Sequence, residues 1–319
     1  MKKDGKIRVG ISACLLGEKV RFDSGHKHDR YLTDTLGQFF SFVPVCPEIE
    51  VGMGVPRETV NLQGSVESPS MIGTKSGKDW TEQMRTFSRK RTEQLEKYRL
   101  RGYILKKDSP SCGMERVKLY PGPKSTPERK ARGLYADALI RRYPLLPVEE
   151  EGRLHDIKIR ENFIVRVFAY DRVQNLFENG YQRKDVMEFH TVHKYLLLAH
   201  SPKHYSQLGK IVAAIKEYKA EEFAKIYSEM FMDALGFKST VAKNVNVMQH
   251  IMGFLKKHLD AEDRKYILNI IEDYRNELVP LIVPITLIKQ FIDKYQIDYI
   301  RNQYYLNPHP RELMLRNHV

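Results

Sequence analysis

Three cysteines are the residues best suited to chemistry in this chain of 319 residues. Cys14, Cys46 and Cys112 are separated by 31 and then 65 residues, and these spacings exclude the compact zinc-finger and ferredoxin patterns. An odd and sparse set of cysteines also argues against a disulfide framework and for a reducing compartment. Scattered cysteines are ordinarily small buried hydrophobic residues, so their surroundings must decide whether they do chemistry.

Each cysteine closely follows a short stretch that is predicted to be a β-strand. The predicted strands are 6–11, 41–45 and 103–105, and the predicted helices in the same region are 27–40, 79–100 and 128–143. This alternation predicts an α/β domain with an open, mostly parallel, Rossmann-like sheet. Loops at the carboxyl ends of parallel strands converge on one crevice, so we expect the three thiols to lie there together.

Three thiolate donors at one crevice indicate a metal centre. A [4Fe–4S] cluster held by three cysteines leaves one iron without a protein ligand, which is a Lewis-acid position with affinity for sulfur. A structural zinc ion would need a fourth ligand, and His26 or His28 is the candidate for it. Buried thiols that bind no metal are the third alternative.

Polar residues beside the cysteines are candidates for the chemistry itself. Glu48 lies two residues after Cys46, where a carboxylate facing the crevice can act as a general base. Ser109 and Ser111 precede Cys112 and can donate hydrogen bonds or position a water, although a turn with locally satisfied hydroxyls explains them more simply. Further residues that we expect at the mouth of the crevice are Asp23, Gly25, His26 and Lys27.

The second half of the chain has helical periodicity throughout and predicts an all-α bundle. We expect an α/β domain over 1–150 with a charged linker at 149–152, a linking helix region over 151–184, and a helical domain over 185–319. The helices predicted in the last of these are 185–199, 202–217, 220–235, 240–258, 261–277, 284–295 and 298–305.

Four histidines of the helical half have spacings that resemble a metal site. They are His190, His193, His200 and His204. No carboxylate or cysteine joins them in a recognisable ligand pattern, so histidines in a helical core or on a helix surface are the simpler interpretation.

The charge of the chain is +13 and is unevenly distributed. Residues 185–319 carry 18 basic and 16 acidic side chains, whereas residues 1–184 carry 35 and 24. Such an excess suits a polyanionic partner, with solubility as the plain alternative. The candidate phosphate contacts are Arg85, Arg89, Lys90, Arg91, Lys124, Arg129, Lys130 and Arg132.

No segment indicates a membrane protein. The first residues, MKKDGKIRVGIS, have no long apolar run or cleavage site of a signal peptide, and the apolar run at 278–288 is broken by two prolines. We therefore expect a cytoplasmic protein with no membrane partner.

The blocks that contain the cysteines resemble a known family. GISACLLGEKVRFDSGHK, PVCPEIEVGMGVPRE and LKKDSPSCG resemble the signature blocks of the TudS-type desulfidases, the thiouracil desulfurase family. The segment 153–169 and the helical half, including FHTVHKYLLLAHSPKHY, resemble the YbgA-like domain. The two in this order resemble the bacterial tRNA 4-thiouridine desulfidases called RudS, and the resemblance covers essentially the whole chain.

The resemblance implies specific roles for the residues singled out above. It implies that Cys14, Cys46 and Cys112 hold a [4Fe–4S] cluster, that Glu48 and Ser109 are catalytic, and that thiolated tRNA is the partner and substrate. The expected reaction is hydrolytic desulfidation of 4-thiouridine to uridine without net electron transfer. The alternatives are the same chemistry on free thiouracil or a thionucleoside, and a non-enzymatic iron–sulfur or zinc protein that senses or carries sulfur.

Overall fold

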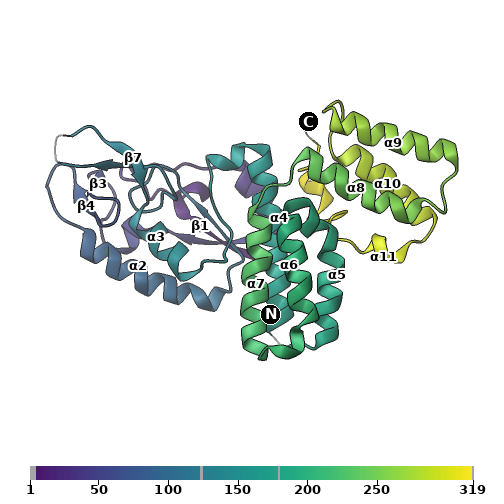
Figure 1. Ribbon diagram of the computed structural model, residues 1–319. Helices are drawn as coiled ribbons and strands as arrows, with labels where there is room; N and C mark the ends of the chain where they lie inside the picture. The colour runs from purple at the N-terminus through teal and green to yellow at the C-terminus, as the bar shows by residue number, and fades with distance from the viewer. Residues whose placement is uncertain (1–4, 123–124, 179, 318–319) are drawn as a thin grey trace. The chain divides into compact units, whose positions relative to one another are not determined.

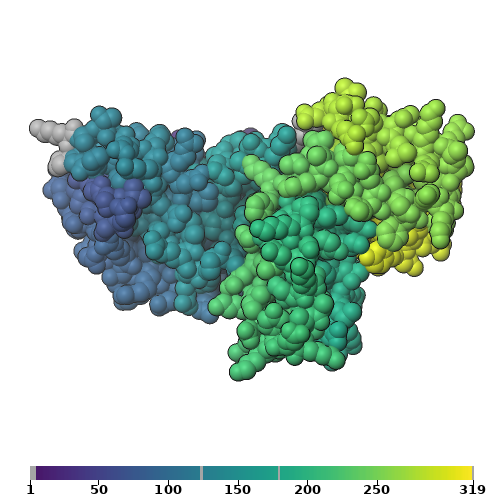
Figure 2. All heavy atoms as spheres, viewed as in Figure 1, coloured from purple at the N-terminus to yellow at the C-terminus, as the bar shows by residue number. Residues whose placement is uncertain are grey.

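The computed structural model describes residues 5–122, 125–178 and 180–317 of the chain. Two compact units, Met1–Asp156 and Ile157–Val319, make up the chain (Figure 1). The first unit is α/β and the second is helical, so both predicted fold classes are confirmed. Within each unit the side chains fill the space between the ribbons (Figure 2). Among the described residues, no helix is long and apolar enough to cross a membrane.

Sheet A consists of four parallel strands in the order β2-β1-β5-β8. Their bounds are Ile7–Ser12 (β1), Phe40–Val45 (β2), Gly102–Leu105 (β5) and Val148–Glu150 (β8). Strands β1 and β5 are buried along almost their whole length, as expected for interior strands of a parallel sheet. Because β2 and β5 flank β1 on opposite sides, a crevice forms at the carboxyl ends of these strands.

A glycine allows the two central strands to pack tightly. A Cβ atom at Gly10 would lie 2.2 Å from the ring of Tyr103, its partner in the register between β1 and β5. The buried Tyr103 therefore needs the bare backbone of β1 beneath its ring. Its hydroxyl forms a 3.0 Å hydrogen bond with that of Tyr135, which links the sheet to the helix beside it.

Sheet B is a second, mixed sheet that the sequence did not predict, with strand order β4-β3-β6-β7. Its strands are Val60–Gly64 (β3), Pro69–Gly73 (β4), Val117–Tyr120 (β6) and Glu128–Ala131 (β7). Alternate residues of these strands, including Leu62, Met71 and Leu119, form a core that also contains Met84 of a neighbouring helix. The apolar pattern is too short in each strand to be recognised without its partner strand.

Helices α2 (Thr81–Leu95) and α3 (Leu134–Arg142) pack side by side in this unit (Figure 1). The predicted helix over 79–100 corresponds to α2. The prediction of one helix over 128–143 is wrong in its first third, because residues 128–131 pair with β6 as β7 and the helix begins only after Gly133. Antiparallel pairing across the chain thus overrides a local helical pattern.

The predicted helix over 27–40 is also wrong. Only a π-helical turn, Tyr31–Thr35, and a 3-10 turn, Leu36–Gln38, form in this segment. The segment ends in sheet A instead, where Phe40 is the first residue of β2 and pairs with Ile7.

The acidic segment 149–152 is not a linker. Glu149 and Glu150 end the edge strand β8, and Glu151 follows them directly. All three glutamates are buried, with 6–8% of their surface exposed. Buried carboxylates need partners: Glu149 pairs with Arg153, Glu150 accepts a hydrogen bond from the amide of Met114, and Glu151 pairs with Lys106.

The second unit consists of helices packed in two groups. Helices α4 to α7 contact one another, and α8 contacts α5, α9 and α10. The bounds are Ile157–Glu178 (α4), Arg183–His200 (α5), Pro202–Ala213 (α6), Ala220–Gly236 (α7), Val241–Leu255 (α8), Ala261–Arg275 (α9), Ile282–Lys294 (α10) and Asp298–Arg301 (α11). Side-chain caps at Ser201, Thr240 and Asp260 begin three of the helices.

Candidate active site: a cavity lined by three cysteines

A cavity of about 480 Å³ lies at the carboxyl ends of β1, β2 and β5, and all three cysteines line it. Cys14 lies in the 3-10 turn Ala13–Leu16 that follows β1. Cys46 follows β2 directly and begins the short helix α1 (Pro47–Glu50). Cys112 lies in the loop after β5, and it is buried like Cys14. The topology of sheet A therefore brings together thiols that are far apart in the sequence.

The loop that carries Cys112 is held by the first turn of α3. The amides of Leu134 and Tyr135 donate hydrogen bonds to the carbonyl oxygens of Pro110 and Ser111. These amides would otherwise lack partners at a helix N-terminus. A Cβ atom at Gly133 would lie 2.4 Å from the Ser111 carbonyl oxygen, so only glycine permits this approach.

The loop after β1 folds back over Cys14. The amide of Lys27 donates a hydrogen bond to the Cys14 carbonyl oxygen at 2.9 Å, and Lys27 lines the cavity. Asp23 is exposed and accepts a hydrogen bond from the amide of Gly25 at 3.0 Å, so it shapes this loop. Of the residues predicted at the mouth, only Lys27 lines the cavity.

Burial raises the pKa values of all three thiols, that of Cys14 to about 11. At neutral pH such thiols are protonated, and a bound cation is needed to stabilise them as thiolates. Three soft donors on one cavity, two of them buried and Cys46 partly buried, fit an iron–sulfur cluster, which binds proteins through thiolates.

The structure gives no support to the zinc alternative. The Nδ1 atom of His26 accepts a hydrogen bond from the amide of His28, and Nε2 of His28 lies 3.0 Å from the Thr33 hydroxyl. Neither histidine lines the cavity. Across the part of the chain that the structure describes, no three His, Cys, Asp or Glu side chains are spaced to bind one metal ion.

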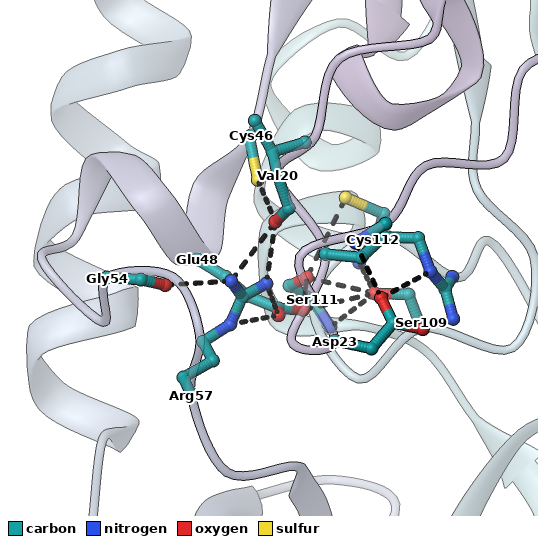
Figure 3. A network of polar contacts seen from close by, with 11 residues as sticks. Val20, Asp23, Cys46, Glu48, Gly54, Arg57, Ser109, Ser111 and Cys112 are labelled. Carbon is teal, nitrogen blue, oxygen red and sulfur yellow. Dashed lines mark hydrogen bonds and ion pairs between the residues drawn. The ribbon is translucent and has the colours of Figure 1, made fainter.

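Glu48 lies on the cavity wall in a network of polar contacts (Figure 3). Its Oε2 atom accepts hydrogen bonds from Nη2 and Nε of Arg57 at 2.5 and 3.1 Å. The side chains are only 15% and 7% exposed, so solvent screens this ion pair little. A guanidinium that donates two hydrogen bonds fixes the orientation of the carboxylate.

The other carboxylate oxygen of Glu48 faces the two serines (Figure 3). The hydroxyl of Ser111 donates to Oε1 at 2.7 Å, whereas that of Ser109 is 3.5 Å away. The two hydroxyls lie 2.9 Å apart, and Ser111 is also 3.7 Å from the sulfur of Cys112. Ser109 Oγ also accepts a hydrogen bond from the amide of Cys112 at 3.1 Å. The structure thus connects Glu48, both serines and one cysteine in a continuous chain of contacts.

Arg57 is a functional candidate that sequence reasoning missed. Besides Glu48 it binds the carbonyl oxygens of Val20 and Gly54, so it joins its own loop to helix α1 and to the loop after β1. The signal available in the sequence was its place in GVPRE, nine residues after Glu48. Nothing in that spacing shows that the side chain returns to the carboxylate.

Most of the basic residues proposed to contact phosphate are engaged in ion pairs. Arg85 pairs with Glu82, Arg129 with Asp108, Lys130 with Glu128, and Arg132 with Asp137. Arg91 is largely buried against Glu50, which removes it from the surface that RNA could reach. Arg89 and Lys90 on α2 are exposed. Lys124 lies outside the described residues.

The four histidines of the helical unit have separate partners. His190 contacts the hydroxyl of Tyr227, and the fully buried His193 contacts the Phe189 carbonyl oxygen and accepts from Nε of Arg172. His200 contacts the carbonyl oxygen of Phe237, and His204 contacts Ser201 and Asp233. Each histidine is therefore a residue of the helical core or of a helix end, as the simpler interpretation predicted.

Comparison with known proteins identifies both halves of the chain. Residues 9–151 match the family of 2-thiouracil desulfurases, and residues 194–310 match a protein family of unknown function, DUF1722. The chain thus combines a region that matches 2-thiouracil desulfurases with a region that matches DUF1722. The predicted fusion is thereby confirmed, and the first of its domains supports a desulfidase activity.

Individual relatives match one half each. YbgA of Escherichia coli K12 is 27% identical over 158 residues, which are 49% of this chain and 94% of YbgA. YbbK of Bacillus subtilis 168 is 28% identical over 152 residues, which are 46% of this chain and 97% of YbbK. A solved structure of the [4Fe-4S]-dependent thiouracil desulfidase TudS is 26% identical, with a TM-score of 0.40, and covers 50% of this chain and 100% of its own.

Proposed function

We propose that the desulfurase domain holds a [4Fe–4S] cluster on Cys14, Cys46 and Cys112 and converts 4-thiouridine in tRNA to uridine. The observation that carries the proposal is the chain of contacts from Glu48 through Ser111 to Cys112 at the wall of the cysteine cavity. The match to 2-thiouracil desulfurases supports removal of sulfur from a thiolated pyrimidine. The [4Fe-4S] dependence of TudS supports the choice of cofactor.

The proposed reaction exchanges sulfur for oxygen without electron transfer. The C4 thiocarbonyl and one water give a C4 carbonyl and hydrogen sulfide, which leaves as hydrosulfide and a proton. When bound, the cluster supplies a Lewis-acid iron with affinity for sulfur, because three cysteines leave one iron without a protein ligand.

Glu48 is the group that moves the proton in this proposal. Its carboxylate lies on the cavity wall with its orientation fixed by Arg57, and in this proposal it accepts a proton from the attacking water. The hydroxyls of Ser111 and Ser109 lie beside its Oε1 atom and can orient that water or bind the oxygen that develops at C4. Arg57 remains in place as the counter-ion of the site after each turnover.

The cavity of about 480 Å³ has the size of ordinary small-ligand sites. A base within folded tRNA must therefore leave its stack to enter, at a cost of a few kcal/mol. The basic excess of residues 1–184 supports a phosphate partner that could supply this energy. Arg89 and Lys90 are the exposed candidates on α2.

Sulfide release from thiolated tRNA and from free 4-thiouracil, measured side by side under anaerobic conditions, tests the proposal. We expect faster release from tRNA, and a rate at low substrate that falls as salt rises, because binding displaces counterions from phosphates. A preference for the free base would replace tRNA with a small-molecule substrate. No release from either would overturn the desulfidase proposal.

A further inference from the structure

Lys106 lies on the cysteine cavity in a setting that differs from the other lysines there. It follows β5 directly, and its amide donates to the Ser12 hydroxyl at the end of β1. Its side chain is only 13% exposed. Lys27, Lys107 and Lys118 line the same cavity but are exposed. Lys106 is therefore the lysine of this wall whose charge water screens least.

A buried carboxylate holds the Lys106 ammonium in place. Oε1 of Glu151 lies 2.5 Å from its Nζ atom, and Oε2 of Glu151 accepts the amide of Lys107 at 2.7 Å. The carboxylate is thus fixed at both oxygens, and its side chain is 10% exposed. Breaking such a pair on one side leaves the other charge buried and uncompensated.

One hydrogen-bond donor of this ammonium has no acceptor among the described residues. A lysine ammonium has three N–H groups. Two of those of Lys106 donate to Glu151 and to the Lys107 carbonyl oxygen, the latter at 3.1 Å. Residues 5–122, 125–178 and 180–317 provide no acceptor for the third. Because Lys106 lines the cavity, the third donor is available to a ligand inside it.

The charge of Lys106 acts on the cysteine side of the cavity. Lys106 and Cys14 both line this cavity. A cation on this wall attracts small anions that enter the cavity. A single N–H donor suits a one-atom acceptor, whereas a planar carboxylate or phosphate favours the two-pronged guanidinium of arginine.

We propose that Lys106 binds the hydrosulfide anion released in the cavity and that Glu151 is the positioning residue that holds Lys106 for this contact. The inference rests on the proposed function, because desulfidation is the reaction that produces hydrosulfide there. The contact is a charge-assisted hydrogen bond from the ammonium to the sulfur, and no covalent bond forms at Lys106.

Titration of the anaerobic holoprotein with sodium sulfide, followed through its visible absorption, tests this assignment. We expect Lys106→Met to raise the sulfide dissociation constant about tenfold, as for loss of one hydrogen bond between charged groups. The matched control is Lys97→Met, which removes an exposed lysine of the same unit and should leave sulfide affinity unchanged. Wild-type affinity in Lys106→Met would overturn the inference.

Two further variants separate charge from structure. Lys106→Arg keeps the cation and should stay within about threefold of the wild-type affinity, and Glu151→Gln should weaken binding less than Lys106→Met does. A tenfold loss in Lys106→Arg would show that the positive charge at this position does not account for sulfide binding, which also overturns the inference. Because this titration needs no thiolated substrate, its result is independent of whether the protein desulfidates tRNA, a free base or neither.

Discussion

The three cysteines and the four histidines of the helical unit are both of residue types that bind metals, but the structure brings only the cysteines together at one cavity. Cys14 and Cys112 are distant in the sequence, yet they line one cavity. His190 and His204 are close in the sequence, yet each is bound to its own partner. Nearness along a helix brings side chains to one face, but a site also requires that they converge on one cavity.

Removal of one cysteine should have the largest effect on iron binding and activity, and it tests directly whether the two sets of residues differ. We expect Cys112→Ala to abolish both iron binding and sulfide release, because a three-cysteine site loses a thiolate ligand. Iron content and activity of anaerobically reconstituted protein measure this. His200→Asn is the matched change in the other set and should keep wild-type iron content. Equal iron content in both variants would show that the cysteines are only core residues.

The proton-transfer role predicted for Glu48 gives the next largest effect. Glu48→Gln should lower the rate of sulfide release about 10²- to 10⁴-fold, the usual contribution of a general base. Iron content should be unchanged, since the carboxylate is not among the proposed ligands. Glu82→Gln, an exposed glutamate on α2, serves as the control. An unchanged rate in Glu48→Gln would assign the base to another group.

Gly133, which packs against the loop that carries Cys112, allows the stability of the two units to be compared. Gly133→Ala should cost about 1–3 kcal/mol of unfolding free energy, because the added methyl group meets the backbone of Ser111. Gly253→Ala in α8 has open space around it and should instead stabilise by up to about 1 kcal/mol. Denaturant melts of both variants give these values. A neutral Gly133→Ala would mean that the cysteine loop moves without cost.

Lowering the pH should affect stability through the buried histidines and not through the cysteines, because burial shifts their pKa values in opposite directions. Burial lowers the pKa of His200 to about 4. Below pH 6.5 the unfolded chain therefore binds more protons than the folded protein, and the free energy of unfolding decreases as the pH falls toward 4. Each such histidine costs about 2 kcal/mol at pH 5. The cysteine thiols, with raised pKa values, do not titrate there.

Melting curves between pH 7 and pH 5 measure this effect. The wild-type protein should lose stability more steeply than His200→Asn, whose amide can still donate to the Phe237 carbonyl oxygen. Parallel losses in the two proteins would show that His200 is not held neutral in the core.

The sequence supported some parts of the fold much better than others. The strands that precede the cysteines and the long helices of the second unit were predictable, because their hydrophobic patterns are local. The strands of sheet B were not, since β3 and β6 are separated by α2 and recognise each other only by pairing. The helix predicted over 128–143 failed for the same reason, because β7 needs β6 beside it.

By itself the sequence determined that three cysteines follow strand ends, that Glu48 and Ser109 lie near two of them, and that a helical domain follows. Only the tertiary structure decided that Arg57 returns to Glu48 and that Glu151 holds Lys106 at the cavity. Hydrophobic periodicity shows which face of an element is buried. The partner of a charged side chain depends on how distant loops meet, and no local pattern records that.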